Sequence, residues 1–444
     1  MGLKWLTIAV LVSAVALAQT IHTYDGGYKE LFVAVSPDRA GDIVAVGWII
    51  RSENLFGLVV KLDLHGNVIW SKKMGGIYFP RAVYVDSENN IYICSISGAL
   101  VKLSPSGELG WARALPQPCW QVFEWNGYIY ALGDYEVYQF DKEGNLVNTW
   151  YFVGVSYRLV SSIVAGDRLY LLGWYDVPSV IAVDSNFRVV AAKTIADPAL
   201  NPWFITTDGS RLYIGLLNAS DRSMVVLAVD QQLNLQWAVK WERRGIFPPL
   251  ILSTTPERAV GVTSTGDGSF TGKISNAVYY NGRIYVPLYV EREGGLDGLL
   301  VMFDTSSRRV VGYYNISNAV LLSASVYHGR GGGWVAAVGF FLGDAGKQFV
   351  ENPPPVKPAS LVLEDFSPDV HSEEGETAPP LSVNLVDYPL NSASVDPPPD
   401  ALLFLIYLPL VIGGVVEVGV HFALVALGLA LLVALAVINA RSRK

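Results

Sequence analysis

The chain has 444 residues, of which 51% are hydrophobic and only 16% are charged, and its formal net charge is −8. A negative charge argues against a nucleic-acid partner, which would require a basic surface. The excess of apolar residues lies mostly at the two ends, so the middle of the chain is expected to be a soluble domain between targeting or membrane segments.

The first element is a secretory signal peptide, predicted over residues 1–19. Lys4 precedes an apolar stretch from Leu6 to Leu17, and a small-residue Ala-Leu-Ala sequence ends at Ala18. This layout is typical of a signal peptide that is cleaved near Ala18 or Thr20. An uncleaved N-terminal anchor is the alternative interpretation.

A four-strand unit repeats across residues 20–366. A short apolar phrase of the type Ile-Tyr-x-x-Gly begins at Ile91, Ile129, Leu169 and Leu212, at intervals of 38, 40 and 43 residues. Each phrase is preceded by one strand and followed by two more, which a polar turn such as Ser-Pro-Ser-Gly separates. Four strands with a period near 40 residues are typical of propeller blades.

Counting the second strand of each unit predicts seven blades. These strands begin near Ile43, Ile91, Ile129, Leu169, Leu212, Ile284 and Trp334. The expected fold is therefore all-β, a seven-bladed β-propeller of four-stranded blades, followed by a C-terminal transmembrane α-helix. Insertions at 242–273 and 343–358 interrupt the ring, and long loops on a rigid scaffold often carry binding residues. The last blade lacks a fourth strand, which either 381–386 or Ile21–Tyr24 would supply, closing the ring.

Composition changes after the last repeat. Eleven of the 24 prolines lie between residues 351 and 400, together with many acidic residues and one Lys. We expect residues 367–400 to form a semi-extended acidic stalk that lifts the ring off a membrane or wraps its side.

The apolar segment 401–438 predicts a membrane anchor. Pro409 and the Gly413-Gly414 pair divide it, and the part at 418–438 is long enough to cross a bilayer as a helix of ~20 residues. Residues 401–416 would then lie at the outer interface or extend the helix. The basic tail 439–444 is typical of a cytoplasmic flank. These features predict a single-pass protein of the cell membrane, with the propeller extracellular and the C-terminus cytoplasmic.

One side of this helix carries a stripe of small residues, which lets another helix approach closely. The stripe consists of Gly419, Ala423, Ala426, Ala430 and Ala434. Glu417 and His421 lie on the opposite side, one helical turn apart, and ionisable groups within a span usually face protein or water. They predict a membrane protein partner bound through the helix. The alternative is that both lie at the outer interface.

Few residue types with reactive side chains are present. Cys94 and Cys119 form a disulfide or remain two buried thiols, and the extracellular location permits the disulfide. Asn218 and Asn315 begin N-glycosylation sequons.

No HExxH, CxxC or GxSxG motif occurs, so no catalytic residue or cofactor is predicted. A calcium or sugar loop at Asp267-Gly268-Ser269 competes with the simpler interpretation of a polar surface loop. The tryptophans either stack on a glycan or pack in the blades: Trp48, Trp120, Trp125, Trp174 and Trp203.

The segment Val59–Gly76 resembles the repeat of the PQQ-like, quinoprotein-type β-propeller superfamily. In that repeat an Asp caps a turn, a Gly follows, and a Trp packs between neighbouring sheets. The match is complete at Asp63, Gly66 and Trp70 and partial in three further copies, at Ser104, Gly107 and Trp111, at Asp141 and Gly144, and at Asp230 and Trp237. Adjacent cysteines and a calcium-binding acid set are missing, so the resemblance implies the blade and not quinoprotein catalysis.

The combination of topology and missing catalytic motifs favours a binding or scaffold module, an accessory subunit of a membrane or cell-envelope complex. Its ligand on the propeller face would be an envelope protein or a glycan. An extracellular hydrolase, lyase or quinoprotein-like enzyme with a site at the central mouth is one alternative, and a surface-layer or filament component is another. The low content of Cys and Met is typical of an archaeal surface protein from a hot habitat.

Overall fold

The structure is a computed structural model. The longer segments that it describes are 19–25, 29–51, 54–153, 158–175, 177–243, 246–247, 277–292, 295–329 and 332–350. The shorter segments are 356–358, 361, 363–365, 369–373, 378, 381, 383–387, 391–392, 401–412 and 415–417. The expected signal peptide up to residue 18, the helix at 418–438 and the tail at 439–444 lie outside these residues.

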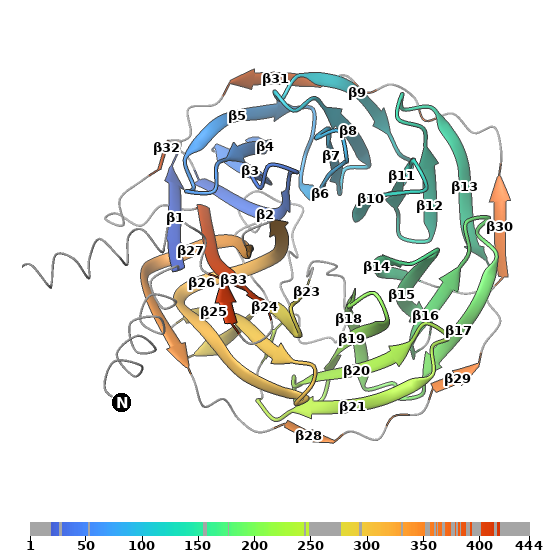
Figure 1. Ribbon diagram of the computed structural model, residues 1–444. Helices are drawn as coiled ribbons and strands as arrows, with labels where there is room; N and C mark the ends of the chain where they lie inside the picture. The colour runs from blue at the N-terminus through green and yellow to red at the C-terminus, as the bar shows by residue number, and fades with distance from the viewer. Residues whose placement is uncertain are drawn as a thin grey trace, which may run out of the picture.

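Five antiparallel blades are arranged around a ring (Figure 1). Blade 1 contains β2 (Lys29–Pro37), β3 (Ile43–Arg51), β4 (Asn54–Leu62) and β5 (Val68–Gly75). Blade 2 contains β6 (Pro80–Val85), β7 (Ile91–Ser95), β8 (Ala99–Leu103) and β9 (Leu109–Ala114). Blade 3 contains β10 (Gln121–Trp125), β11 (Tyr128–Leu132), β12 (Glu136–Phe140) and β13 (Leu146–Val153). Blade 4 contains β14 (Arg158–Ala165), β15 (Arg168–Tyr175), β16 (Val177–Val183) and β17 (Val189–Ile195). Blade 5 contains β18 (Leu200–Thr207), β19 (Arg211–Asn218), β20 (Met224–Asp230) and β21 (Leu235–Trp241).

The sixth blade is one ten-stranded sheet, so the expectation of seven blades is wrong. Its strands are β22 (Ile246–Phe247), β23 (Val278–Tyr280), β24 (Arg283–Arg292), β25 (Gly295–Asp304), β26 (Arg309–Gly329), β27 (Gly332–Val350), β33 (Ala401–Ile412), β1 (Gln19–Asp25), β32 (Asn391–Ser392) and β34 (Val415–Glu417). The two blades expected from the sequence are fused because β26 runs on through two bulges and pairs with both β25 and β27.

Part of each expected insertion is strand. Residues 343–350 continue β27, so the second insertion is mostly strand. In the first, β22 pairs with β24, and so does β23, which follows the insertion; residues 248–276 between them lie outside the described part of the chain.

The ring closes through segments from the two ends of the chain. β33 pairs with β27 on one side and with β1 on the other. Residues 401–412, expected in the anchor, are therefore a strand of the sheet. The error has a physical reason, because a continuous apolar run is also the pattern of a strand with neighbours on both sides. The Tyr24 hydroxyl then donates to the Gly66 carbonyl of blade 1 at 2.7 Å.

Residues 356–365 and the first part of the expected stalk at 367–400 lie along the outer edges of five blades. β28 (Val356–Pro358), β29 (Leu363–Asp365), β30 (Asp369–Glu373) and β31 (Asn384–Asp387) add a fifth strand to blades 5, 4, 3 and 1. At blade 2 the Leu381 N–H donates to the Ala112 carbonyl at 3.1 Å. We call residues 356–387 the belt. It passes the blades in reverse order along their outer edges, as Figure 1 shows. Wrapping was one of the two expectations for this segment, and β31 borders blade 1 rather than completing the last blade.

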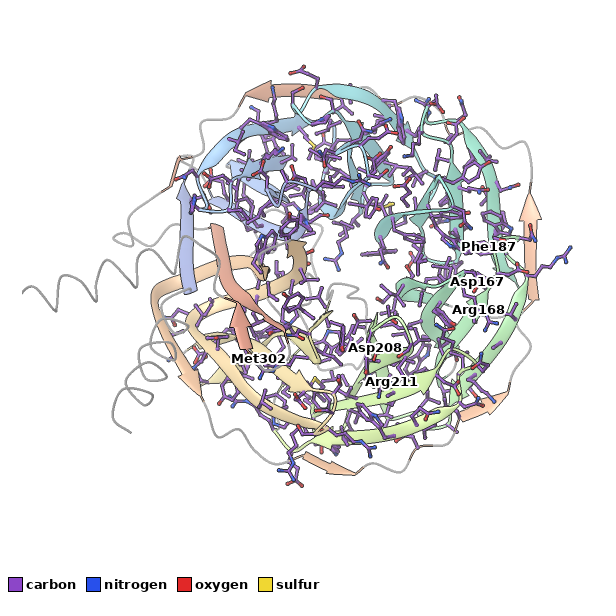
Figure 2. All side chains as sticks on the ribbon, in the orientation of Figure 1. Asp167, Arg168, Phe187, Asp208, Arg211 and Met302 are labelled. Carbon is purple, nitrogen blue, oxygen red and sulfur yellow. A yellow bond between two sulfur atoms is a disulfide. The ribbon has the colours of Figure 1, made fainter. Side chains whose placement is uncertain are left out.

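Turns and aromatic side chains join neighbouring blades. Asp63 Oδ1 accepts the N–H groups of His65 and Asn67, both at 2.8 Å, so the aspartate caps the turn as expected. The Trp70 indole N–H donates to the Pro105 carbonyl of the next blade at 3.2 Å. Where the Trp is missing, other groups replace it. Arg168 Nη1, labelled in Figure 2, donates to the Gln231 carbonyl of blade 5 at 3.0 Å. Blades 3 and 4 meet through Phe187, also labelled there, which stacks on Trp150.

The ring has two faces, distinguished by the loops they carry. The turn face carries the capped turns such as Asp63–Asn67. The loop face carries the turns between second and third strands, such as Asp134–Tyr135, and the connections between blades, such as 115–120. Because innermost strands begin at the loop face, residues there gather around the central mouth.

Candidate functional site

A group of side chains from blades 2, 3 and 4 meets at the loop face. Trp120 lies in the connection that leads into β10, and its indole N–H donates to Asp134 Oδ1 at 3.2 Å. The guanidinium carbon of Arg81, from β6, lies 5.5 Å from the centre of the Trp120 ring. This is within the range of a cation–π contact. We call Arg81, Trp120, Gln121, Asp134 and Ser162 the Trp120 cluster.

A disulfide fixes the position of Trp120. Cys94 on β7 is bonded to Cys119, with 5.3 Å between the two Cα atoms. The Cys119 N–H also donates to the Ser95 carbonyl at 2.9 Å. The residue before Trp120 is therefore held to the neighbouring blade by a covalent bond and a hydrogen bond.

Gln121 joins the innermost strands of blades 3 and 4. Its Nε2 donates to the Ser162 carbonyl at 3.1 Å, and its Oε1 accepts the Ser162 N–H at 2.9 Å and the hydroxyl at 3.1 Å. Since both ends of the amide are engaged, Gln121 serves to hold the wall of the ring in place.

Arg81 differs from every other member of the cluster. It is 3% exposed, and its Nε and Nη1 atoms have no hydrogen-bond partner. Burial holds the pKa of Arg81 well below its ordinary value. It lies at a β-bulge of β6, and the residues skipped by the bulges of β2, β14 and β18 and by the bulge of β26 between Leu321 and Ser323 are uncharged: Val33, Val160, Trp203 and Leu322. A charge therefore occupies a position that is otherwise apolar.

Exposed aromatic side chains lie in the same connections and turns of the loop face as the cluster. Tyr78, in the connection before β6, is 49% exposed, and Tyr135, next to Asp134, is 40% exposed. Of the five tryptophans considered from the sequence, Trp48, Trp125 and Trp203 are buried in the blades, whereas Trp120 and Trp174 are half-buried. We call Tyr78, Trp120 and Tyr135, which lie in connections of the loop face, the aromatic surface.

The two glycosylation sequons have different surroundings. Asn218 ends β19, and its Oδ1 accepts the Ser220 N–H at 3.0 Å in a turn of the loop face. Asn315 lies inside the sixth sheet between Leu299 and Gln348, and its Nδ2 donates to Asp297 Oδ2 at 3.3 Å. Asn218 lies at the end of a strand, whereas Asn315 lies within one.

The expected membrane-helix residues are almost all outside the described part. Glu417 is the exception: it ends strand β34, and its backbone pairs with Leu410. The helical spacing assumed between Glu417 and His421 is therefore wrong at Glu417. No described helix is long and apolar enough to cross a membrane. His421, Gly419 and the alanines of the stripe are not described, and neither is Asp267-Gly268-Ser269.

The charged groups with shifted pKa values belong mainly to turns. Burial alone would raise the pKa of Asp86, but hydrogen bonds from Asn90 and Glu88 and the charge of Lys142 outweigh it and lower that pKa. The pKa values of Asp63 and Asp230 are also lowered, because hydrogen bonds within their own turns outweigh the effect of burial. Among the described residues, no three His, Cys, Asp or Glu side chains are placed to hold a metal ion.

Arg81 was not recognised from the sequence as a site residue. The only signal is its charge within the otherwise apolar strand phrase Pro80–Val85. The link between Arg81 and Trp120 was not visible, because it depends on how two blades meet.

No family model matches the chain, and no curated protein matches it. Among solved structures, the β-propeller domain of Cps50 (Swd1) from Myceliophteria thermophila has 13% identity and a TM-score of 0.49, over 72% of this chain and 96% of that one. BamB from Moraxella catarrhalis has 12% identity and a TM-score of 0.43, over 68% and 92%. Quinohemoprotein alcohol dehydrogenase from Comamonas testosteroni has 12% identity and a TM-score of 0.42, over 78% and 77%. We assign the β-propeller from the chain's own sheets.

Proposed function

We propose that the chain is a cell-surface binding module that docks a partner protein on the loop face of its propeller. The observation that carries this proposal is the aromatic surface of Tyr78, Trp120 and Tyr135. Tyr and Trp are enriched at protein interfaces because they bury a large area at a low cost in side-chain entropy. The disulfide at Cys119 supports the proposal, since a fixed surface loses less entropy on binding.

The proposed location is the outer side of the cell membrane, with residues 418–438 as the anchor. The apolar composition of this segment and its basic flank support the proposal. A chain that ends after Glu417 retains every described strand. We expect the full chain to remain in the membrane fraction after alkaline extraction and the shortened chain to be released. Retention of the shortened chain would contradict the anchor.

Docking on the loop face is tested by co-purification of the full chain from native membranes in mild detergent. The variant Tyr78→Ala with Tyr135→Ala removes two exposed rings without opening the core. We expect it to lose the partner protein. Tyr128→Ala is the matched control, because Tyr128 is an exposed tyrosine (37%) on the turn face. A partner that stays bound to the double variant, or that Tyr128→Ala releases, would contradict the proposal. A glycan as the only bound molecule would also contradict it.

A second contact is proposed through the small-residue stripe of the anchor. Ala426→Leu with Ala430→Leu keeps the helix apolar but prevents the close approach of another helix. We expect this variant to stay in the membrane and to lose any partner that binds by the helix. Because the propeller is unchanged, the experiment separates this contact from docking on the loop face.

A further inference from the structure

The wall of the ring contains a buried guanidinium, that of Arg81, most of whose donors meet no acceptor among the described residues. The Nε and Nη1 atoms of Arg81 carry three of the five N–H donors of the guanidinium, and neither atom has an acceptor. Asp134, the acid of the cluster, accepts from the Trp120 indole, and it is not a hydrogen-bond partner of Arg81 Nε or Nη1. Contact with the Trp120 ring involves the ring's face and satisfies none of these donors.

Such a charge is costly unless something compensates it. A buried ion without a partner costs several kcal/mol, and each unmet donor adds a desolvation penalty. A neutral residue would avoid this cost, as Val33 and Leu322 do at the corresponding bulges. Phe79, two residues before Arg81, has a φ of +54°, a conformation that bulky residues rarely adopt. Strained backbone of this kind gathers at binding sites.

We propose that Arg81 binds a small oxyanion in the ring wall between blades 2 and 3, with Trp120 packed against its guanidinium. An oxyanion fits because a guanidinium donates parallel hydrogen bonds to two oxygens of one carboxylate, phosphate or sulfate group. The ligand is small because Arg81 is almost wholly enclosed. This site goes beyond the proposed docking function and stands even when the loop face binds no protein.

The test measures the response of the full chain in detergent to anions at equal ionic strength. We expect sodium phosphate and sodium acetate to raise the midpoint of thermal unfolding by several degrees relative to sodium chloride, because a ligand that binds only the folded state stabilises it. The two oxyanions distinguish a tetrahedral ligand from a planar one. An equal response to all three salts would overturn the proposal.

Two variants tie the response to Arg81. Arg81→Leu introduces the residue found at the corresponding bulge of β26, and we expect it to abolish the difference between the salts while unfolding no earlier in chloride. Arg113→Leu is the matched control. Arg113 also lies over a tryptophan, 5.6 Å from the Trp111 ring, but its Nε donates to the Gly144 carbonyl at 2.7 Å. Its replacement is expected to leave the anion response intact. Full response in Arg81→Leu contradicts the site.

A third measurement covers the case in which Arg81→Leu does not fold. Arg81→Lys keeps the charge but loses the paired donors, so phosphate affinity is expected to fall at least tenfold. In the wild-type chain labelled at arginine Nε, titration with phosphate is expected to shift one buried Nε–H resonance, which Arg81→Lys removes. An unshifted resonance at saturating phosphate would overturn the proposal.

Discussion

Trp111 packs directly on Gly144 of the following blade. Its indole N–H donates to the Lys142 carbonyl in the same turn at 3.0 Å. A Cβ atom placed on Gly144 would lie 2.6 Å from Cδ2 of the indole. Gly144 also has a φ of +85°, which side chains disfavour. A glycine is therefore needed at position 144 for two reasons: the turn has a positive φ there, and the Trp111 ring of the neighbouring blade leaves no space for a side chain.

Replacement of Gly144 by Ala should destabilise the ring more than backbone strain alone explains. Gly127→Ala is the matched control, because Gly127 has a φ of +81° and open space where the Cβ would be. We expect the control to lower the free energy of unfolding by about 1–2 kcal/mol, the cost of a left-handed residue. Gly144→Ala should cost about 1–3 kcal/mol more, the cost of overpacking. Urea unfolding measures both, and equal losses would contradict the packing role of Trp111.

The disulfide should contribute substantially to stability. Cys94 and Cys119 close a loop of 25 residues. A loop of this length restricts the unfolded chain by about 3.5 kcal/mol in the chain-entropy model. We expect Cys94→Ala with Cys119→Ala to lower the free energy of unfolding by roughly this amount. Both sulfurs are buried, so a reductant should act on the wild type only near its unfolding transition. Equal stability of the variant and the wild type would contradict this account.

The belt should protect the outer strands of the blades locally. In blade 3, Val370 pairs with Phe152 and His371 with Tyr151. Successive residues of an antiparallel strand direct their N–H groups to opposite sides. Of the two variants Val370→Pro and His371→Pro, one must therefore lose a backbone hydrogen bond to β13. Hydrogen–deuterium exchange of residues 149–153 should rise in that variant. β17 and β21 should stay protected, because β29 and β28 cover them independently.

Val370→Ala controls for the loss of the side chain, since it keeps the N–H group. Its exchange in residues 149–153 is expected to match the wild type. Faster exchange around the whole ring in a proline variant would mean that the belt acts as one cooperative unit.

Acid should weaken the turn at Asp86. The pKa of Asp86 is below its usual 3.8 in the folded protein, so this carboxylate stabilises the fold above the unfolded pKa and stops doing so as the pH falls through the folded value. Asp86→Asn keeps an oxygen for the turn but removes the charge. We expect the variant to be less stable than the wild type at pH 7, with a gap that closes below about pH 4. Urea unfolding between pH 2 and 7 checks this, and a gap that persists at pH 2 would contradict it.

Local pattern was enough to locate the blades. Seven second strands were expected, and β3 and β7 begin at the expected residues, Ile43 and Ile91. Their apolar phrases are bounded by capped turns, so each strand is specified by residues close to it. The fusion of the last two units was not visible, because a bulge and a turn near Asn318 differ little in sequence.

Long-range pairing was what the sequence left open. The belt strands have three to five residues and no clear alternation, so only the edges of β21, β17, β13 and β5 make them strands. β33 has the composition of a membrane segment. It is a strand because β27 and β1 offer it pairing edges on both sides, which the sequence does not show. Arg81 was missed for the same reason, because its surroundings come from two blades.

The pairing of β1 sets a schedule for biosynthesis. β1 ends at Asp25, yet its ladder partners β32 and β33 begin at Asn391 and Ala401. At roughly 5–20 residues per second the ribosome needs about 20–75 s to make the intervening chain. During that time β1 has no pairing strand, and the sixth blade cannot yet be completed beside blade 1. The propeller ring can therefore close only near the end of translation. Chaperones that shield unpaired strand edges would matter most until then.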